Sequence, residues 1–91
     1  MKIRIEKSFA KDVNKIKDKK LLQNLSNIIT ELENSTSLRE ISHIKKIKGY
    51  KTFFRIRIGD YRLGLEELQG KDLYLIRILH RKEIYRYFPN K

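Results

Sequence analysis

The sequence predicts an α+β domain, with an N-terminal strand and a helical hairpin packed on one face of a small antiparallel sheet. Apolar residues recur at helical spacing between residues 9 and 32, and they alternate with polar residues in the second half of the chain. Between two of the alternating runs lies Gly59-Asp60, a pair of the kind that forms two-residue hairpin turns. Helices followed by consecutive strands indicate that the helices cover one face of the sheet.

Length and composition limit the classes of protein. With 91 residues, the chain is expected to form one domain, 1–91. Its formal net charge of +11 favours nucleic acid, an acidic protein or an anionic surface as partner. The absence of cysteine excludes disulfides and Cys-based zinc sites and fits a reducing cytoplasm. No apolar run reaches the length of a membrane span, so we expect a cytoplasmic protein without a membrane partner.

The first half of the chain is expected to form a strand and two helices. Residues 2–6 alternate, with Ile3 and Ile5 on one face, and predict a strand. Ser8 is expected to cap the first helix, whose apolar stripe includes Phe9 and Val13. The polar run 17–20 separates it from a second helix that ends near residues 34–37. The apolar stripe of the second helix comprises Leu21, Leu22, Leu25, Ile28, Ile29 and Leu32.

The second half is expected to be mostly strands. Residues 38–47 keep some helical spacing, which leaves both a helical turn and extended chain open, and Gly49 ends this connector. Residues 53–58 and 61–66 form the hairpin, and Gln69-Gly70-Lys71-Asp72 predicts a second turn. A strand over 73–79 is apolar on both faces and so is expected to be central. Its faces are expected to hold Tyr74, Ile76 and Ile78 on one side and Leu75, Arg77 and Leu79 on the other. Residues 82–88 predict a terminal helix that ends at Pro89.

The hairpin concentrates arginine on one face of the sheet. A period of two places Phe54, Ile56, Ile58, Tyr61, Leu63 and Leu65 on the core side. Arg55, Arg57 and Arg62 then share the open face. Three arginines on a rigid hairpin are suited to phosphate, because a guanidinium donates paired hydrogen bonds to phosphate oxygens. Gly64 leaves the middle of this face without a side chain. It indicates either a bulge in the strand or space in which a backbone or a nucleobase can approach the sheet.

These segments resemble the RelE/ParE superfamily, the toxins of type II toxin–antitoxin modules. The resemblance covers nearly the whole chain and rests on KKIKG (45–49), RIRIGDYRLGLE (55–66) and ILHRKEIYR (78–86). It implies a small, basic, microbial-ribonuclease-like fold that is silenced by an antitoxin with an acidic or amphipathic segment. The RelE branch cleaves mRNA in the ribosomal A site without a metal, by attack of the 2′-hydroxyl on the adjacent phosphate. The ParE branch has the same fold but inhibits DNA gyrase. A gyrase inhibitor and a catalytically weak, nucleic-acid-binding toxin homologue therefore stay open as alternatives.

The resemblance also implies catalytic residues. Arg62 of the DYRL motif matches the family arginine that holds the scissile phosphate. Arg81 of the HR pair matches an arginine that acts as acid or phosphate clamp. Tyr85 matches a tyrosine that stacks on a base and assists proton transfer, although Tyr87 is close enough in sequence to compete for that assignment.

The chain departs from the family at the position of the general base. Arg55 and Arg57 stand where well-characterised RelE members carry lysines, and we expect both to bind phosphate as part of the catalytic set. Arginine stays protonated in proteins and is a poor base. Two alternatives therefore stay open: the base is another residue, with His80 and Glu66 as candidates, or the reaction relies on electrostatics and positioning. For His80, a structural role at a strand end is favoured. No partner for His43 is evident from the sequence.

Further cations are expected to contact RNA phosphates without sequence preference. They are Lys45, Lys46, Lys48, Lys51, Arg77 and Lys82. With two histidines and no cysteine, neither a transition-metal site nor a cofactor is expected. The expected partners are a cognate antitoxin and the ribosomal A site with its mRNA.

Overall fold

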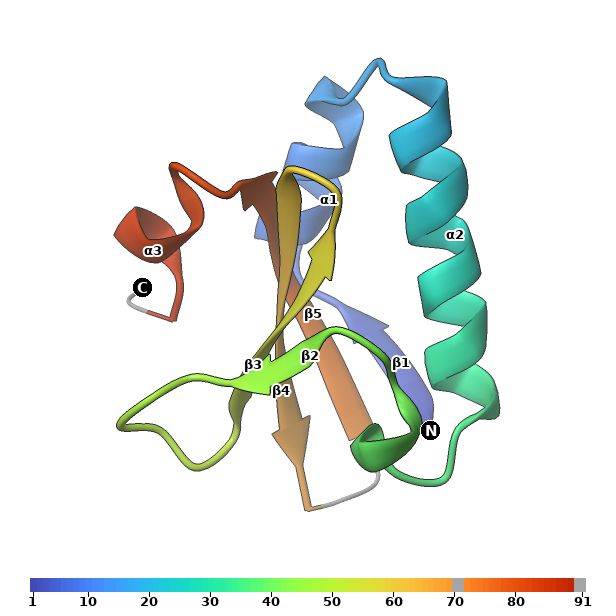
Figure 1. The fold of residues 1–91 in the computed structure, drawn as a ribbon, viewed down its shortest axis with the longest axis vertical. Helices are drawn as coiled ribbons and strands as arrows, with labels where there is room; N and C mark the ends of the chain where they lie inside the picture. The colour runs from blue at the N-terminus through green and yellow to red at the C-terminus, as the bar shows by residue number, and fades with distance from the viewer. Residues whose placement is uncertain (70–71, 90–91) are drawn as a thin grey trace.

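The computed structural model describes residues 1–69 and 72–89, which form a sheet with helices on both faces. The elements follow in the order β1 (Lys2–Ile5), α1 (Lys7–Lys15), α2 (Lys19–Asn34), η1 (Leu38–Glu40), β2 (Ile44–Lys46), β3 (Phe53–Ile58), β4 (Tyr61–Leu68), β5 (Asp72–His80) and α3 (Ile84–Tyr87). The strands form one sheet in the order β1-β5-β4-β3-β2. Helices α1 and α2 lie on one side of it and α3 lies on the other (Figure 1). The predicted α+β class is confirmed.

The sheet is mixed rather than wholly antiparallel. Strands β2, β3, β4 and β5 pair antiparallel in sequence order, whereas β1 pairs parallel with β5. β5 therefore lies between β1 and β4, as its apolar faces predict. The connector over 38–47 contains both of the structures that the sequence left open, because η1 is one helical turn and β2 is a short edge strand.

The helices begin at residues other than those predicted. Asp18 caps α2, because its carboxylate accepts hydrogen bonds from the backbone N–H groups of Lys20 and Leu21. The predicted Ser8 cap of α1 is wrong. α1 follows β1 directly at Glu6, and Ser8 lies inside the helix, where its hydroxyl donates to the carbonyl of Ile76 at 2.6 Å.

The main core lies between the sheet and the α1–α2 hairpin. The helices contribute Phe9, Leu21, Leu25 and Leu32, and the strands contribute Ile56, Ile58, Leu63, Leu65, Leu73, Leu75 and Ile78. Phe54 and Tyr61 are half-buried against this core. The alternation predicted for the β3–β4 hairpin is therefore confirmed, with its apolar row under the helices. Among the described residues, no helix is long and apolar enough to cross a membrane.

A bulge interrupts β5. Gly64 of β4 lies opposite Arg77, but the next residue, Leu65, lies opposite Leu75. Ile76 is therefore an extra residue in β5, and an extra residue reverses the alternation of side chains beyond it.

The faces predicted for the last strand are wrong because of this bulge. Ile78 lies in the main core, whereas Tyr74 and Ile76 belong to a second cluster on the face under α3. Leu75 and Leu79, expected to share the other face, are separated in the same way. The bulge is set by pairing between strands, so period-two alternation along one strand does not reveal it.

The C-terminal segment covers part of the face that the sequence left open. Within the range predicted as helical, α3 forms over Ile84–Tyr87, and both Ile84 and Phe88 are buried against the sheet. The ring of Phe88 fills the space above Gly64. The predicted turn at Gln69-Gly70-Lys71-Asp72 includes Gly70 and Lys71, which lie outside the described residues.

Candidate active site

A shallow depression of about 550 Å³ lies at the turn of the β3–β4 hairpin. Its lining comprises His43, Arg57, Gly59, Asp60, Arg62 and Arg81. We call this hollow the arginine depression and its three arginines the arginine cluster. Arg57 of β3 and Arg62 of β4 are direct cross-strand neighbours, and Arg81 follows β5. Three of the five predicted catalytic residues are thus brought to one place from three segments of the chain.

Arg62 is held against the hairpin turn. Its Nη1 donates to the carbonyl oxygens of Gly59 at 2.9 Å and Tyr61 at 3.0 Å. Burial lowers the pKa of the Arg62 guanidinium below its ordinary value, and the charge of Arg55 lowers it further. A fixed guanidinium among like charges favours an anion, since bound phosphate would relieve their repulsion.

Glu66, one of the two candidates for the base, is engaged elsewhere. Glu66 accepts a hydrogen bond from the hydroxyl of Thr52 at 3.0 Å. This contact lies near the start of β3, away from the hairpin turn. Glu66 therefore does not line the arginine depression.

His43 is a site residue that the sequence analysis missed. The Arg57 Nη2 lies 3.1 Å from His43 Nδ1, and the Arg57 backbone N–H donates to the His43 carbonyl at 3.1 Å. Arginine can only donate, so Nδ1 accepts and the proton of a neutral His43 is on Nε2. The expectation that His43 has no partner is wrong. Recognising β2 would have revealed the contact, because pairing of Ile44 with Ile56 places His43 beside Arg57.

Arg81 lies beside the hairpin through its backbone. Its N–H donates to the Asp60 carbonyl at 2.8 Å, and its Nε lies 3.7 Å from the Asp60 carboxylate. Both side chains are largely exposed, and such pairs contribute little to stability. The backbone contact fixes the position of Arg81, while its guanidinium remains accessible to an anion.

Arg55 and Tyr85 complete the predicted catalytic set. Arg55 lies opposite Gly64 and, with Arg57 and His43, lines a second hollow of about 220 Å³. Tyr85 is 57% exposed on α3, and α3 packs on the face of the sheet that carries Arg55 and Arg62. The arginines of the hairpin and the helix that carries Tyr85 therefore share one face of the sheet.

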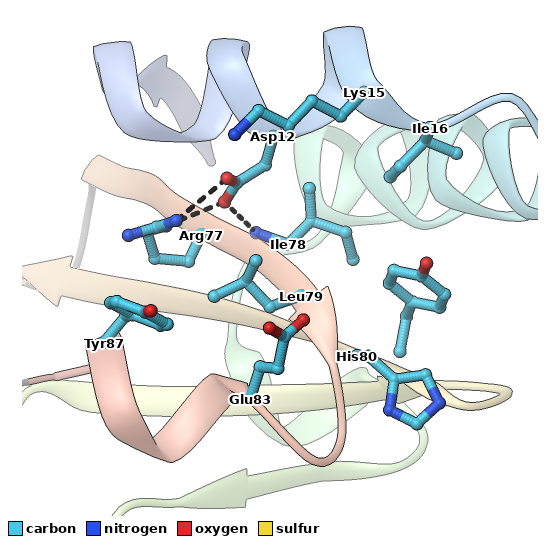
Figure 2. A pocket seen from close by; sticks show the side chains of 10 residues that line it. Asp12, Lys15, Ile16, Arg77, Ile78, Leu79, His80, Glu83 and Tyr87 are labelled. Atoms are coloured by element: carbon cyan, nitrogen blue, oxygen red, sulfur yellow. Dashed lines mark hydrogen bonds and ion pairs between the residues drawn. The ribbon is translucent and has the colours of Figure 1, made fainter.

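Arg77 lies apart from this cluster. Its Nε and Nη2 donate to the Asp12 carboxylate at 2.8 and 2.9 Å, and Asp12 also accepts from the Ile78 N–H (Figure 2). These hydrogen bonds raise the pKa of Arg77 against the opposing effect of burial. The Arg77 guanidinium also lies 5.2 Å from the centre of the Tyr87 ring. Arg77 is thus an anchor between α1 and β5, which does not favour its predicted contact with RNA.

His80 and Tyr87 line the pocket beside that anchor. This pocket, of about 360 Å³, lies between α1, β5 and α3 (Figure 2). His80 packs edge-on against Tyr61, and its Nδ1 accepts from the Lys82 N–H at 3.1 Å. The structure therefore places His80 outside the arginine depression, as it does Glu66. Tyr87 lies against Arg77, outside the arginine depression, so Tyr85 remains our candidate for the functional tyrosine.

The predicted RNA-binding lysines are exposed. Lys45 of β2 lines the smaller hollow with Arg55. The others are Lys46, Lys48, Lys51 and Lys82. Their contact with RNA remains a prediction. Within residues 1–69 and 72–89, no group of three or more His, Asp or Glu side chains is placed to hold a metal ion.

Comparison with protein families gives one match over most of the chain. A family model described as the ParE toxin of the type II toxin–antitoxin system, parDE, matches residues 3–85. A curated relative from Methanocaldococcus jannaschii, Toxin RelE3, is 43% identical over 90 residues, which cover 98% of this chain and all of the relative.

Solved structures share the fold. The RelB–RelE antitoxin–toxin complex from Methanococcus jannaschii matches with a TM-score of 0.79 and 41% identity, over 93% of this chain and 98% of that chain. The E. coli DinJ–YafQ complex matches with a TM-score of 0.62 and 17% identity, over 91% and 96% of the two chains. The second likeness concerns the fold alone.

Proposed function

This chain belongs to the RelE/ParE superfamily of type II toxins, and from that premise we propose that it is an endoribonuclease that cleaves mRNA in the ribosomal A site. One observation carries the proposal. Arg57, Arg62 and Arg81 converge on a single depression together with His43, and α3, which carries Tyr85, packs on the same face of the sheet. The depression supplies positive charge and a proton acceptor at one place, and α3 adds an exposed aromatic ring on that face.

The proposed reaction is an internal transfer of the phosphate. The 2′-oxygen of the RNA forms a bond to the adjacent phosphorus while the bond from phosphorus to the 5′-oxygen breaks. The products are a 2′,3′-cyclic phosphate and a 5′-hydroxyl. Negative charge accumulates on the phosphorane in between, and preorganised guanidinium groups stabilise such charge strongly. Arg62 is suited to this role because two carbonyl oxygens already hold it in position.

His43 is our candidate for the base that removes the 2′-hydroxyl proton. Its Nδ1 faces Arg57 and carries a lone pair. When Arg57 binds the scissile phosphate instead, Nδ1 is free to accept that proton. Imidazole is a suitable base near neutral pH, whereas the neighbouring arginines are not. Tyr85 is our candidate to stack on a nucleobase and to protonate the leaving 5′-oxygen, and Arg81 is our candidate to hold the phosphate, since an arginine keeps its proton.

A cognate antitoxin is the proposed protein partner. The RelB–RelE structure contains a toxin of similar sequence together with its antitoxin. A formal net charge of +11 favours an acidic partner segment. An antitoxin that covers the arginine depression would silence the toxin by excluding RNA.

Inhibition of DNA gyrase is the second candidate function. The matching family model is that of the ParE toxin, which favours this alternative. Under it, the arginine cluster would be a protein-binding surface and Arg57, Arg62 and Arg81 would make no bond-breaking contact.

Primer extension on cellular mRNA tests the proposal. Messages are mapped a few minutes after induction of the wild type, of Arg81→Ala and of Arg39→Ala. Arg39 is an exposed arginine on η1, outside the cluster, so its variant is a control for the loss of one positive charge. We expect cuts within translated codons in the wild type and in Arg39→Ala but none in Arg81→Ala. Intact messages with growth arrest and broken plasmid DNA would refute the nuclease and support gyrase inhibition.

A further inference from the structure

The side chain of Phe88, in the C-terminal segment, packs directly against Gly64 in β4. A Cβ atom at Gly64 would lie 2.7 Å from two ring atoms of Phe88 and 2.9 Å from a third. The ring of Phe88, which is only 1% exposed, therefore rests directly on the Gly64 backbone. The requirement for glycine is steric, because every other residue would place a carbon atom where the ring now lies.

The same ring is one of two anchors of α3. Ile84 at the start of α3 is fully buried, and Phe88 lies immediately after its end. The Phe88 N–H donates to the Ile84 carbonyl at 2.8 Å, and the Phe88 ring packs edge-on against Phe53 at 5.5 Å. A helix of four residues is not stable by itself. The position of α3 on the sheet therefore depends on these two buried side chains.

The anchors determine where Tyr85 lies. Tyr85 follows Ile84 directly and is exposed, so its own contacts with the core do not hold it. Gly64 is two residues from Arg62 on the same strand and opposite Arg55. The ring that seats α3 therefore lies on the same face of the sheet as the arginines.

We propose that Gly64 and Phe88 are positioning residues that place Tyr85 beside Arg62. The role in catalysis rests on the proposed nuclease function, whereas the seating of α3 does not. Neither residue touches the RNA. Gly64 provides the hollow, Phe88 fills it, and the single turn of α3 carries Tyr85 to the arginine cluster.

Gly64→Ala tests the seating directly. The added methyl group displaces the Phe88 ring, while alanine can still donate and accept the backbone hydrogen bonds of β4. Hydrogen exchange of single amides reports the result without any assay of activity. We expect the Phe88 amide to lose protection while the amides of Leu63 and Leu65 keep theirs. Unchanged protection at Phe88 would overturn the proposal, whether or not the protein cleaves RNA.

A cycle with Tyr85→Ala tests the link to catalysis. If Gly64→Ala acts through Tyr85, it lowers kcat on its own, by roughly 100-fold for a displaced catalytic group, and lowers it no further in the Tyr85→Ala background. If Gly64→Ala instead causes a purely structural defect, the fold-losses in kcat of the two single variants multiply in the double variant. That result would overturn the positioning role.

A second variant, Phe88→Ala, keeps the proposal testable if Gly64→Ala does not fold. Phe88→Ala removes the same anchor but leaves the main core under α1 and α2 unchanged. It is expected to reproduce both results, and a kcat equal to that of the wild type would contradict the proposal. If the wild type itself cleaves no RNA, the nuclease function fails, and the amide exchange still decides whether Gly64 and Phe88 seat α3.

Discussion

Substitution of Asp12 by asparagine should destabilise the fold more than the same substitution at Asp72, whose side chain is only partly buried. The Asp12 side chain is almost fully buried and accepts three hydrogen bonds, two from Arg77 and one from the Ile78 N–H. The Asp12 carboxylate and the hydrogen bond from the Ser8 hydroxyl to the Ile76 carbonyl both join α1 to the bulge of β5. Asparagine has one acceptor oxygen and would turn an N–H donor toward the guanidinium.

The expected cost follows from the burial of the pair. Breaking a fully buried ion pair by removal of one partner costs about 3–5 kcal/mol. The Arg77 side chain is 22% exposed, so water solvates part of its charge, and asparagine keeps one acceptor. We therefore expect a loss of about 2–4 kcal/mol. The total stability of a chain of this length is roughly 5–13 kcal/mol, so the variant should be visibly weakened.

Urea unfolding followed by circular dichroism measures this loss, with Asp72→Asn as the matched control. Asp72 lies 3.4 Å from Arg4, but their side chains are 33% and 46% exposed. An exposed pair of this kind contributes up to about 1 kcal/mol. Equal losses in the two variants, or a loss below about 1 kcal/mol for Asp12→Asn, would refute the claim that burial makes the Arg77 pair structural.

Three further predictions concern the helix cap, the site and the antitoxin. Asp18→Ala removes the cap of α2 and should lower the free energy of unfolding by about 1 kcal/mol in the same urea titration. His43→Ala should lower kcat of ribosome-dependent cleavage by roughly 10²–10⁴-fold if His43 is the base, and a wild-type kcat would exclude that role. Affinity for the antitoxin should fall as NaCl is raised from roughly 0.1 to 1 M, where the screening length shortens to about 3 Å, as calorimetry can measure. Binding that is independent of salt would indicate a mainly apolar contact.

Local patterns predicted much of the fold. The β3–β4 hairpin was predicted from its two-residue turn, and the extent of α2 was predicted from its apolar stripe. Both signals come from residues that are close together in the sequence. β2 was not predicted, since three residues are too few for a periodic signal. The bulge at Ile76 and the parallel pairing of β1 were not predicted either, because both depend on contacts between distant parts of the chain.

The same distinction applies to the site. The resemblance to a family predicts roles for Arg62, Arg81 and Tyr85, and the fold brings Arg62 and Arg81 to one depression at the hairpin turn. His43 was missed because its contact with Arg57 depends on the unrecognised strand β2. The contact of Arg77 with Asp12 was not predicted, because the two residues lie 65 positions apart in the sequence.

The chemical step can be tested directly with purified chain, programmed ribosomes and two synthetic messages. One message is all RNA, and the other has a single 2′-deoxynucleotide on the 5′ side of the scissile bond. We expect rapid cleavage of the first message, with a 2′,3′-cyclic phosphate end, and no cleavage of the second. Equal cleavage of both messages, or of neither, would contradict the claim that the arginine cluster activates the 2′-hydroxyl of ribosome-bound mRNA.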